Sequence, residues 1–95
     1  MNKYKIELYG KALAEVLDEF GITEAELFGS NNAECVQART ALVVALSKML
    51  SDSEIAELTK KMRRCSVCVI RNRYDDRTAP WTVKRCIDAI KVVAK

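Results

Sequence analysis

The sequence predicts an all-α protein, a compact bundle of about five helices. Apolar residues recur at helical spacing along nearly the whole chain, and no strand-like alternation extends beyond a few residues. The composition is 49% hydrophobic and 31% charged, with one proline and three glycines, which is typical of a packed globular chain. A chain of 95 residues is expected to form a single domain, residues 1–95, with a small core.

The first helix is expected from Lys3 to Phe20, and Gly21 ends it. This N-terminal helix makes up residues 1–21, and its apolar stripe consists of Ile6, Tyr9, Leu13, Val16, Leu17 and Phe20. Thr23 is then a suitable N-cap for a single short turn that Gly29 closes.

A second long helix is expected from about Ala33 to Leu50. Its middle, A-L-V-V-A-L, is apolar on every side, which predicts a central helix that is covered all round. Ser51 lies three residues before Glu54, and this capping box predicts a third helix that ends near Lys61. The buried face of the third helix is expected to consist of Ile55, Leu58 and Met62.

The next helix is expected from Arg64 to Tyr74. Its inward residues are Val67, Ile70 and Tyr74, so the outward residues are Cys65, Ser66, Cys68, Val69, Asn72 and Arg73. After a loop, Pro80 lies in the first turn of the C-terminal helix of residues 79–95, where Trp81 is expected to anchor the helix in the core. The stripe of this last helix consists of Val83, Ile87, Ile90 and Ala94.

Charge is distributed unevenly along the chain, although the net charge is only +3. Residues 7–34 carry seven acidic side chains against the single Lys11, whereas residues 60–73 carry six basic side chains and no acidic one. The basic stretch predicts a polyanionic partner. The longest apolar run, Ala41–Leu46, is too short to cross a membrane, and the N-terminus lacks a signal-peptide pattern. We therefore expect a cytoplasmic protein with no membrane partner.

The four cysteines do not predict a metal or a redox enzyme. Cys65 and Cys68 form a C-x-x-C, but a structural zinc needs four ligands, histidine is absent, and only Cys35 and Cys86 remain. A thioredoxin-like site would also need a preceding strand. Cys35 and Cys86 are interpreted as buried packing residues, and no cofactor is expected. Because no nucleophile–base pair and no phosphate-binding glycine loop is visible, neither an enzyme nor a small-molecule substrate is expected.

Two short helices around a tight basic connection predict a helix-turn-helix within residues 22–78. In this motif the first helix braces against the core and the second enters the major groove of DNA. Arg64 and Ser66 are placed to contact a base or a phosphate. The basic residues Lys60, Lys61, Arg63 and Arg73 are expected to contact mainly phosphates.

Residues 20–74 also resemble a known family. They contain Phe20-Gly21-Ile22 before Leu27, then Ala38-Arg39-Thr40 leading into the apolar helix, then Glu54-Ile55-Ala56, with Ile55 twelve residues before Val67. This pattern resembles the C-terminal DNA-binding domain of the bacterial replication initiator DnaA, which is related in fold to the Trp repressor. The resemblance implies that Arg39 reaches the minor groove and that Arg64, Cys65 and Ser66 read the major groove.

The chain departs from the family signature where Arg63-Arg64 replaces an Asp-His pair and Cys65 replaces a threonine. A different DNA sequence preference is therefore expected. The ATPase module of the family is absent, so the resemblance implies a small stand-alone regulator or replication accessory, of a phage or mobile element.

The predicted DNA contacts are Arg39, Lys60, Lys61, Arg63, Arg64, Cys65, Ser66, Val69, Asn72 and Arg73. The partner they predict is double-stranded DNA, bound with sequence specificity. The alternative is a helical adaptor whose basic face docks an acidic protein. The first helix either extends the core or forms a homodimer contact, and the sequence leaves both open.

Overall fold

The computed structural model describes residues 3–93 and contains six helices and no strand within that range. The helices are α1 Lys3–Phe20, α2 Glu24–Gly29, α3 Ala33–Ser47, α4 Asp52–Thr59, α5 Arg64–Arg73 and α6 Trp81–Val93. The all-α prediction is confirmed. The segment expected as a single turn is the six-residue helix α2, and α3 ends three residues before the predicted Leu50.

Side-chain caps determine where the second, third and fourth helices begin. At the start of α2, the Thr23 hydroxyl accepts a hydrogen bond from the Glu26 amide, and the Glu26 carboxylate accepts one from the Thr23 amide. Ser51 and Glu54 form the same pair of hydrogen bonds at the start of α4. Asn32 caps α3 through its Oδ1, which lies 2.9 Å from the Cys35 amide nitrogen. The predicted N-cap and capping box are therefore confirmed.

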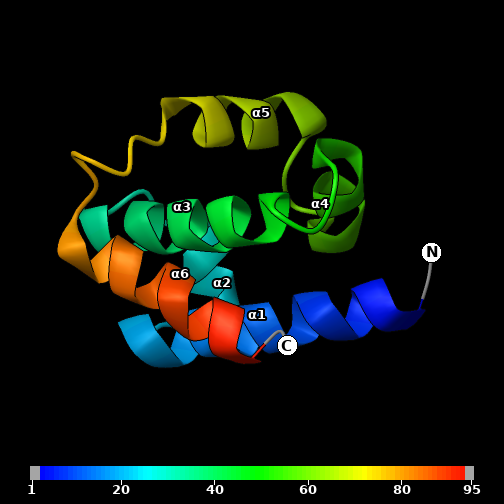
Figure 1. Cartoon of the computed structure of the whole chain (residues 1–95), viewed down its shortest axis with the longest axis horizontal. Helices are drawn as coiled ribbons and strands as arrows, with labels where there is room; N and C mark the ends of the chain where they lie inside the picture. The colour runs from blue at the N-terminus through cyan, green and yellow to red at the C-terminus, as the bar shows by residue number, and fades with distance from the viewer. Residues whose placement is uncertain (1–2, 94–95) are drawn as a thin grey trace.

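The central position predicted for the long apolar helix is also confirmed. All five other helices pack against α3, which crosses the middle of Figure 1 with α5 above it and α1 and α6 below it. The segment Ala41–Leu46 is buried throughout. One hydrophobic core results, to which every helix contributes at least one buried side chain.

The buried face of α1 differs from the predicted stripe. Leu8, Ala12 and Val16 are buried, whereas Ile6 is 51% exposed and Tyr9 is half-buried. Because α1 packs against both α3 and α6, its buried face is the one that contacts these two helices together. Ala12 at the centre of this face permits close approach of the helices. α1 therefore extends the core, as one of the two sequence interpretations proposed.

The prediction that Trp81 anchors the core is wrong. Trp81 is 69% exposed, whereas Val83, Cys86, Ile87 and Ile90 are buried on α6. Trp81 lies two positions before Val83, which is about 200° around a helix, so the tryptophan lies on the opposite face. The guanidinium of Arg85 lies over its ring, 5.4 Å from the centroid. Ala94, the last residue of the predicted stripe, lies outside the described residues.

The packing role predicted for two cysteines is confirmed. Cys35 and Cys86 are both free thiols with no exposed surface. Burial raises the pKa of the Cys86 thiol to about 12, with further contributions from Glu19 and Glu15. Cys86 is therefore a small buried thiol that stays protonated at neutral pH.

Substitution of Leu46 by alanine tests the dependence of the fold on α3. Leu46 is fully buried, so Leu46→Ala is expected to lower the free energy of unfolding by about 2–5 kcal/mol through lost burial and the resulting cavity. Urea denaturation followed by circular dichroism measures this change.

Trp81→Ala is the matched control because it removes a larger side chain from outside the core. It is expected to change the free energy of unfolding by about 1 kcal/mol or less, mostly through the lost contact with Arg85. Equal destabilisation by the two substitutions would contradict the assignment of the core.

Candidate nucleic-acid interface

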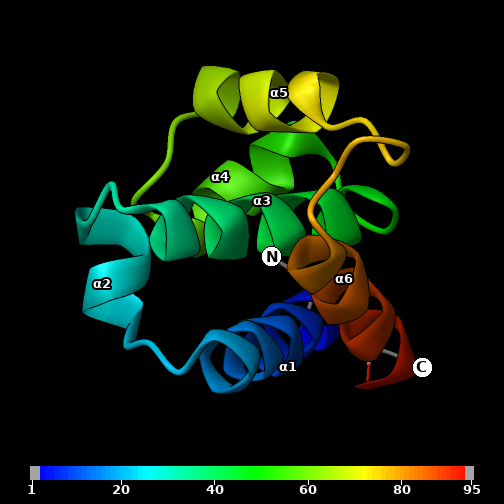
Figure 2. The same ribbon diagram turned by 90° about the vertical axis from the view of Figure 1, so that its left-hand side faces the viewer.

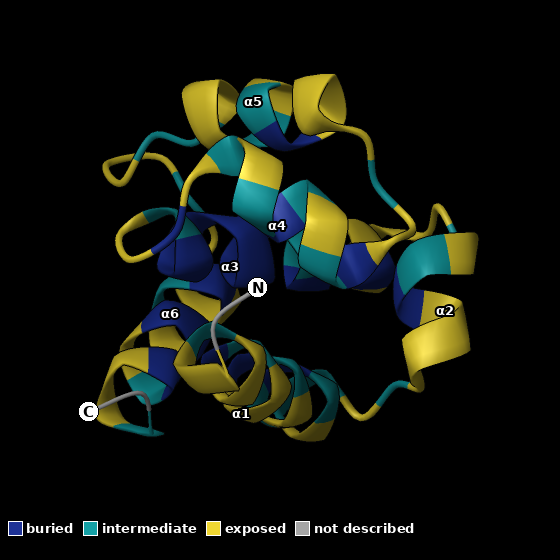
Figure 3. Cartoon of the chain, turned by 90° about the vertical axis from the view of Figure 1, so that its right-hand side faces the viewer, coloured by how far each residue is buried: buried dark blue, intermediate teal, exposed yellow. Residues whose placement is uncertain are grey.

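α5 lies on α3 with one side buried and the other exposed. Val67 is fully buried and Ile70 and Tyr74 are partly buried against the core, as predicted. Exposed residues form the outer surface of α5, and the buried one faces α3 (Figure 3). The predicted outward residues Cys65, Ser66, Val69, Asn72 and Arg73 are all exposed, whereas Cys68 is half-buried.

The connection between α4 and α5, residues 60–63, begins with an unusual backbone conformation. Lys60 has φ 57°, in the left-handed region, and its amide nitrogen closes α4 at 3.1 Å from the Ala56 carbonyl oxygen. A non-glycine residue is disfavoured in this conformation because its Cβ approaches the following carbonyl oxygen. The basic residues in and beside this connection are all exposed, namely Lys60, Lys61, Arg63 and Arg64.

Most cations of the basic stretch form no ion pair among the described residues. In the part of the chain that the structure describes, no ion pair involves Lys60, Lys61, Arg63, Arg64 or Arg73. Arg63 also occupies the N-cap position of α5 without a side-chain hydrogen bond, in contrast to Thr23, Asn32 and Ser51 at the other capped helices. The first turn of α5 is therefore a positive and open part of the surface.

Arg71 is the paired cation of the stretch. Its Nε and Nη2 atoms donate to the two carboxylate oxygens of Asp52, at 3.0 and 2.9 Å, and so join α5 to the first turn of α4. The hydrogen bond from Arg71 lowers the pKa of Asp52, and the charges of Arg71 and Arg64 add to this effect. Sequence analysis missed this contact because the two residues lie 19 positions apart.

Arg39 lies on α3, and its guanidinium contacts the loop between α2 and α3. Arg39 is half-buried, and its Nη2 donates to the Ser30 carbonyl oxygen at 2.7 Å and to Asn31 Oδ1 at 3.3 Å. Figures 2 and 3 both show α2 on the side of the molecule where α5 begins. Lys61 lines a hollow of about 460 Å³ together with Phe28 and Gly29 of α2. Arg39 thus fixes a loop on the side where α5 begins.

Two further hollows adjoin the predicted residues. Lys60 lines one of about 340 Å³ with Ile6, Tyr9 and Leu58. The Tyr9 hydroxyl is buried without a hydrogen-bond partner among residues 3–93, and this burial raises its pKa to about 12. Val69 and Arg73 line the other hollow, of about 320 Å³, at the end of α5 beside α3 and Pro80.

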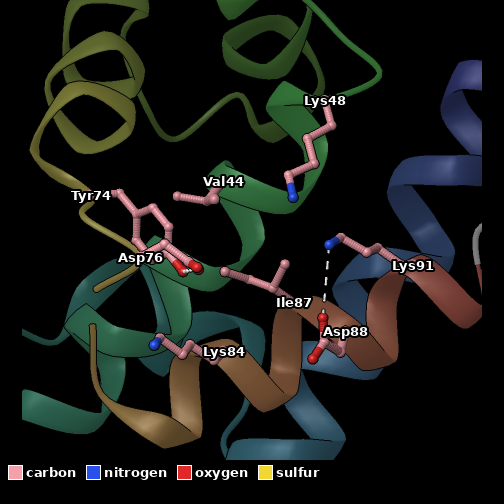
Figure 4. Close-up of a pocket in the computed structure, with 8 residues that line it drawn as sticks. All are labelled: Val44, Lys48, Tyr74, Asp76, Lys84, Ile87, Asp88 and Lys91. Atoms are coloured by element: carbon pink, nitrogen blue, oxygen red, sulfur yellow. Dashed lines mark hydrogen bonds and ion pairs between the residues drawn. The ribbon is translucent and has the colours of Figure 1, made fainter. Parts of the chain in front are cut away.

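A charged cleft of about 390 Å³ lies elsewhere, between α3, α6 and the segment after α5 (Figure 4). The ammonium groups of Lys48 and Lys91 face one another there, and Lys91 lowers the pKa of Lys48. Lys91 also pairs with Asp88 at 3.7 Å. Both lysines lie at the carboxyl ends of helices, where a positive charge is favoured. None of the predicted DNA contacts lines this cleft.

No protein-family model matches the chain, and no curated protein or solved structure shows significant similarity to it. Within residues 3–93, no group of three or more histidine, cysteine or acidic residues is arranged to hold a metal ion. No helix in the same range is long and apolar enough to cross a membrane.

The pair between Arg71 and Asp52 predicts a measurable pH effect. Because the folded protein lowers the pKa of Asp52, the pair stabilises the fold above the unfolded pKa of this carboxyl group, and this contribution disappears as the pH falls through the folded pKa. Arg71→Ala is expected to return the pKa of Asp52 to its ordinary range, measured by NMR titration of the carboxyl carbon.

Arg73→Ala is the control for this titration. It removes the same charge two positions further along α5, from a side chain that has no ion pair in the described chain, and should leave the Asp52 titration unchanged. Similar effects of the two substitutions would show that general charge, rather than the pair, sets this pKa.

The backbone of Lys60 leads to a separate prediction about stability. Glycine adopts the left-handed conformation without a Cβ penalty, so Lys60→Gly is expected to raise the free energy of unfolding by about 1 kcal/mol. Lys61→Gly, at a neighbouring exposed residue outside the left-handed region, should give no gain. Urea denaturation compares them, and an equal effect of both substitutions would contradict the assigned strain.

Proposed function

We propose that this protein binds double-stranded DNA through α4, residues 60–63 and α5, which act together as a helix-turn-helix. The observation that carries the proposal is the exposed group of Lys60, Lys61, Arg63, Arg64 and Arg73, which have no ion pair among the described residues. Cations without an internal counter-charge are available to neutralise phosphates and release the counterions of DNA.

The outer face of α5 supports its proposed insertion into the major groove. Small exposed side chains, Cys65 and Ser66, lie in its first turns and allow the helix to come close to base edges. Arg64 beside them is exposed, and a guanidinium can donate to guanine or to a phosphate. Further along the exposed face, Val69 offers an apolar contact for a thymine methyl group and Asn72 offers hydrogen bonds to adenine.

The brace between α4 and α5 supports the same proposal. The Asp52 carboxylate holds Arg71 through two hydrogen bonds, while Val67 inserts into the core beneath α5. A helix fixed by both contacts presents its outer side chains in one orientation before DNA arrives. The side chains of α5 then lose less conformational entropy when DNA binds, and this favours affinity.

The finer proposals rest on the sequence resemblance to the DnaA C-terminal domain. It supports sequence-specific binding, a minor-groove contact from Arg39, and a small regulator of replication or transcription in a phage or mobile element. Arg63, Arg64 and Cys65 replace residues of the family signature, and this supports a DNA target sequence that differs from that of the family. The rival function, an adaptor that docks an acidic protein on the same face, requires no affinity for DNA.

Fluorescence anisotropy with a labelled random-sequence duplex tests the proposal. Binding is expected at about 50 mM salt, and neutralisation of about five phosphates would weaken it by about 10²–10³-fold at 200 mM. Arg64→Ala should weaken binding by about tenfold at fixed salt through the loss of one contact.

Arg85→Ala is the matched control because it removes an arginine from α6, where the side chain stacks on Trp81 and pairs with Glu19. It is expected to leave DNA affinity unchanged. If the wild-type protein fails to bind any duplex at about 50 mM salt, the proposed function is wrong and the adaptor function is favoured.

A further inference from the structure

The proposed DNA-binding face contains two thiols placed one helical turn apart. Cys65 lies exposed in the first turn of α5, and Cys68 lies half-buried three residues later. In a regular α-helix the Cα atoms of such a pair are about 5 Å apart. Disulfides form when this distance is about 4.4–6.8 Å. The Cα spacing is therefore within the range of a disulfide, but Cβ atoms three residues apart on a helix are about 5–6 Å apart and must approach to about 4 Å, so closing the bond tightens this turn of α5.

The sulfur of Cys68 is held by neighbours on the same helix. It accepts hydrogen bonds from Asn72 Nδ2 at 3.3 Å and Arg71 Nη2 at 3.8 Å. The same Arg71 nitrogen donates to Asp52. The Cys68 sulfur thus contacts the exposed side-chain amide of Asn72 and the guanidinium of Arg71, which also holds Asp52 on α4.

The surroundings of the pair favour thiol oxidation over metal binding. Arg63, Arg64 and Arg73 are exposed along the same segment, and their charge opposes a bound cation. A third ligand for a metal is absent among residues 3–93. The remaining thiols, Cys35 and Cys86, have no exposed surface. Exposure of one thiol beside a second that can react with it is typical of oxidation-sensitive cysteines.

We propose that Cys65 and Cys68 are a modification site at which a hydroperoxide closes a disulfide. The Cys65 sulfur attacks the peroxide, breaks its O–O bond, and becomes a sulfenic acid while the alcohol or water leaves. The Cys68 sulfur then attacks the Cys65 sulfur and displaces hydroxide, which leaves as water with the proton of the second thiol. The two thiols supply two electrons, which reduce the peroxide.

The consequence for DNA rests on the proposed function. The disulfide changes the contact face at Cys65 and removes the two hydrogen bonds that Cys68 now accepts. Asn72 and Arg71 then lose a partner on the proposed face. The oxidised protein is expected to bind duplex DNA about tenfold more weakly, equivalent to the loss of one base contact.

Peptide mass spectrometry after treatment of the whole protein with hydrogen peroxide tests the site. The peptide with Cys65 and Cys68 should lose two hydrogen atoms and regain them with dithiothreitol. Cys35 and Cys86 should stay reduced and react with an alkylating reagent only after unfolding. A protein in which Cys65 and Cys68 both stay free, or join only to other molecules, would overturn the proposal.

Two serine variants separate the steps. Cys68→Ser should accumulate the sulfenic acid at Cys65, which dimedone traps, whereas Cys65→Ser should form neither product. Cys65→Ser should also bind DNA equally well before and after peroxide. If its affinity still falls about tenfold with peroxide, the proposed link between this pair and DNA binding is wrong.

The proposed function and the modification site can fail separately. If the reduced wild-type protein does not bind duplex DNA, the DNA-binding proposal falls, and the mass measurement alone then decides whether Cys65 and Cys68 form the disulfide.

Discussion

The structure depends on the burial of α3. The middle of this helix, Ala41–Leu46, is apolar on every side and is stable in water only when other elements cover it, and five helices pack around α3. Each covering helix needs only one apolar face, so its opposite face is available for charge and for contacts. This constraint places α5 and α1 on opposite sides of α3 (Figure 1), and the exposed cations of α5 therefore lie on the side of α3 away from α1.

Short-range patterns predicted most of the fold, whereas contacts between distant residues could not be predicted. The capping box at Ser51 and the inward position of Val67 follow from spacing along one helix, and both are present. The stripe on α1 was displaced because two neighbours, α3 and α6, share its inward face. Trp81 lies outside the core because it projects about 200° away from Val83 around α6, on the face opposite the buried stripe. The outward residues of the candidate site were predicted well, but Arg71 and Arg39 have partners that only the tertiary structure brings together.

α5 contributes fewer buried residues to the core than α3 or α6 does, and this shapes what it can do. Val67 is its single fully buried residue, and the pair between Arg71 and Asp52 adds a polar link to α4. Mutual repulsion among the exposed cations opposes folding, and the left-handed backbone at Lys60 adds local strain. Such a combination is common where a surface is kept for binding rather than for stability. The Cys68 sulfur also accepts a hydrogen bond from Arg71, so it contacts this polar link.

The exposed position of Trp81 determines what intrinsic fluorescence can report. It is the only tryptophan in the chain, and its ring lies outside the core beneath Arg85. Since the indole is already largely in water in the folded state, unfolding changes its surroundings little, and its emission is a weak measure of folding. The same ring is sensitive to any molecule that covers the start of α6 or displaces Arg85. The protein therefore carries a natural optical probe of its outer surface, next in the chain to Pro80, which lines a hollow with Val69 and Arg73 at the end of α5.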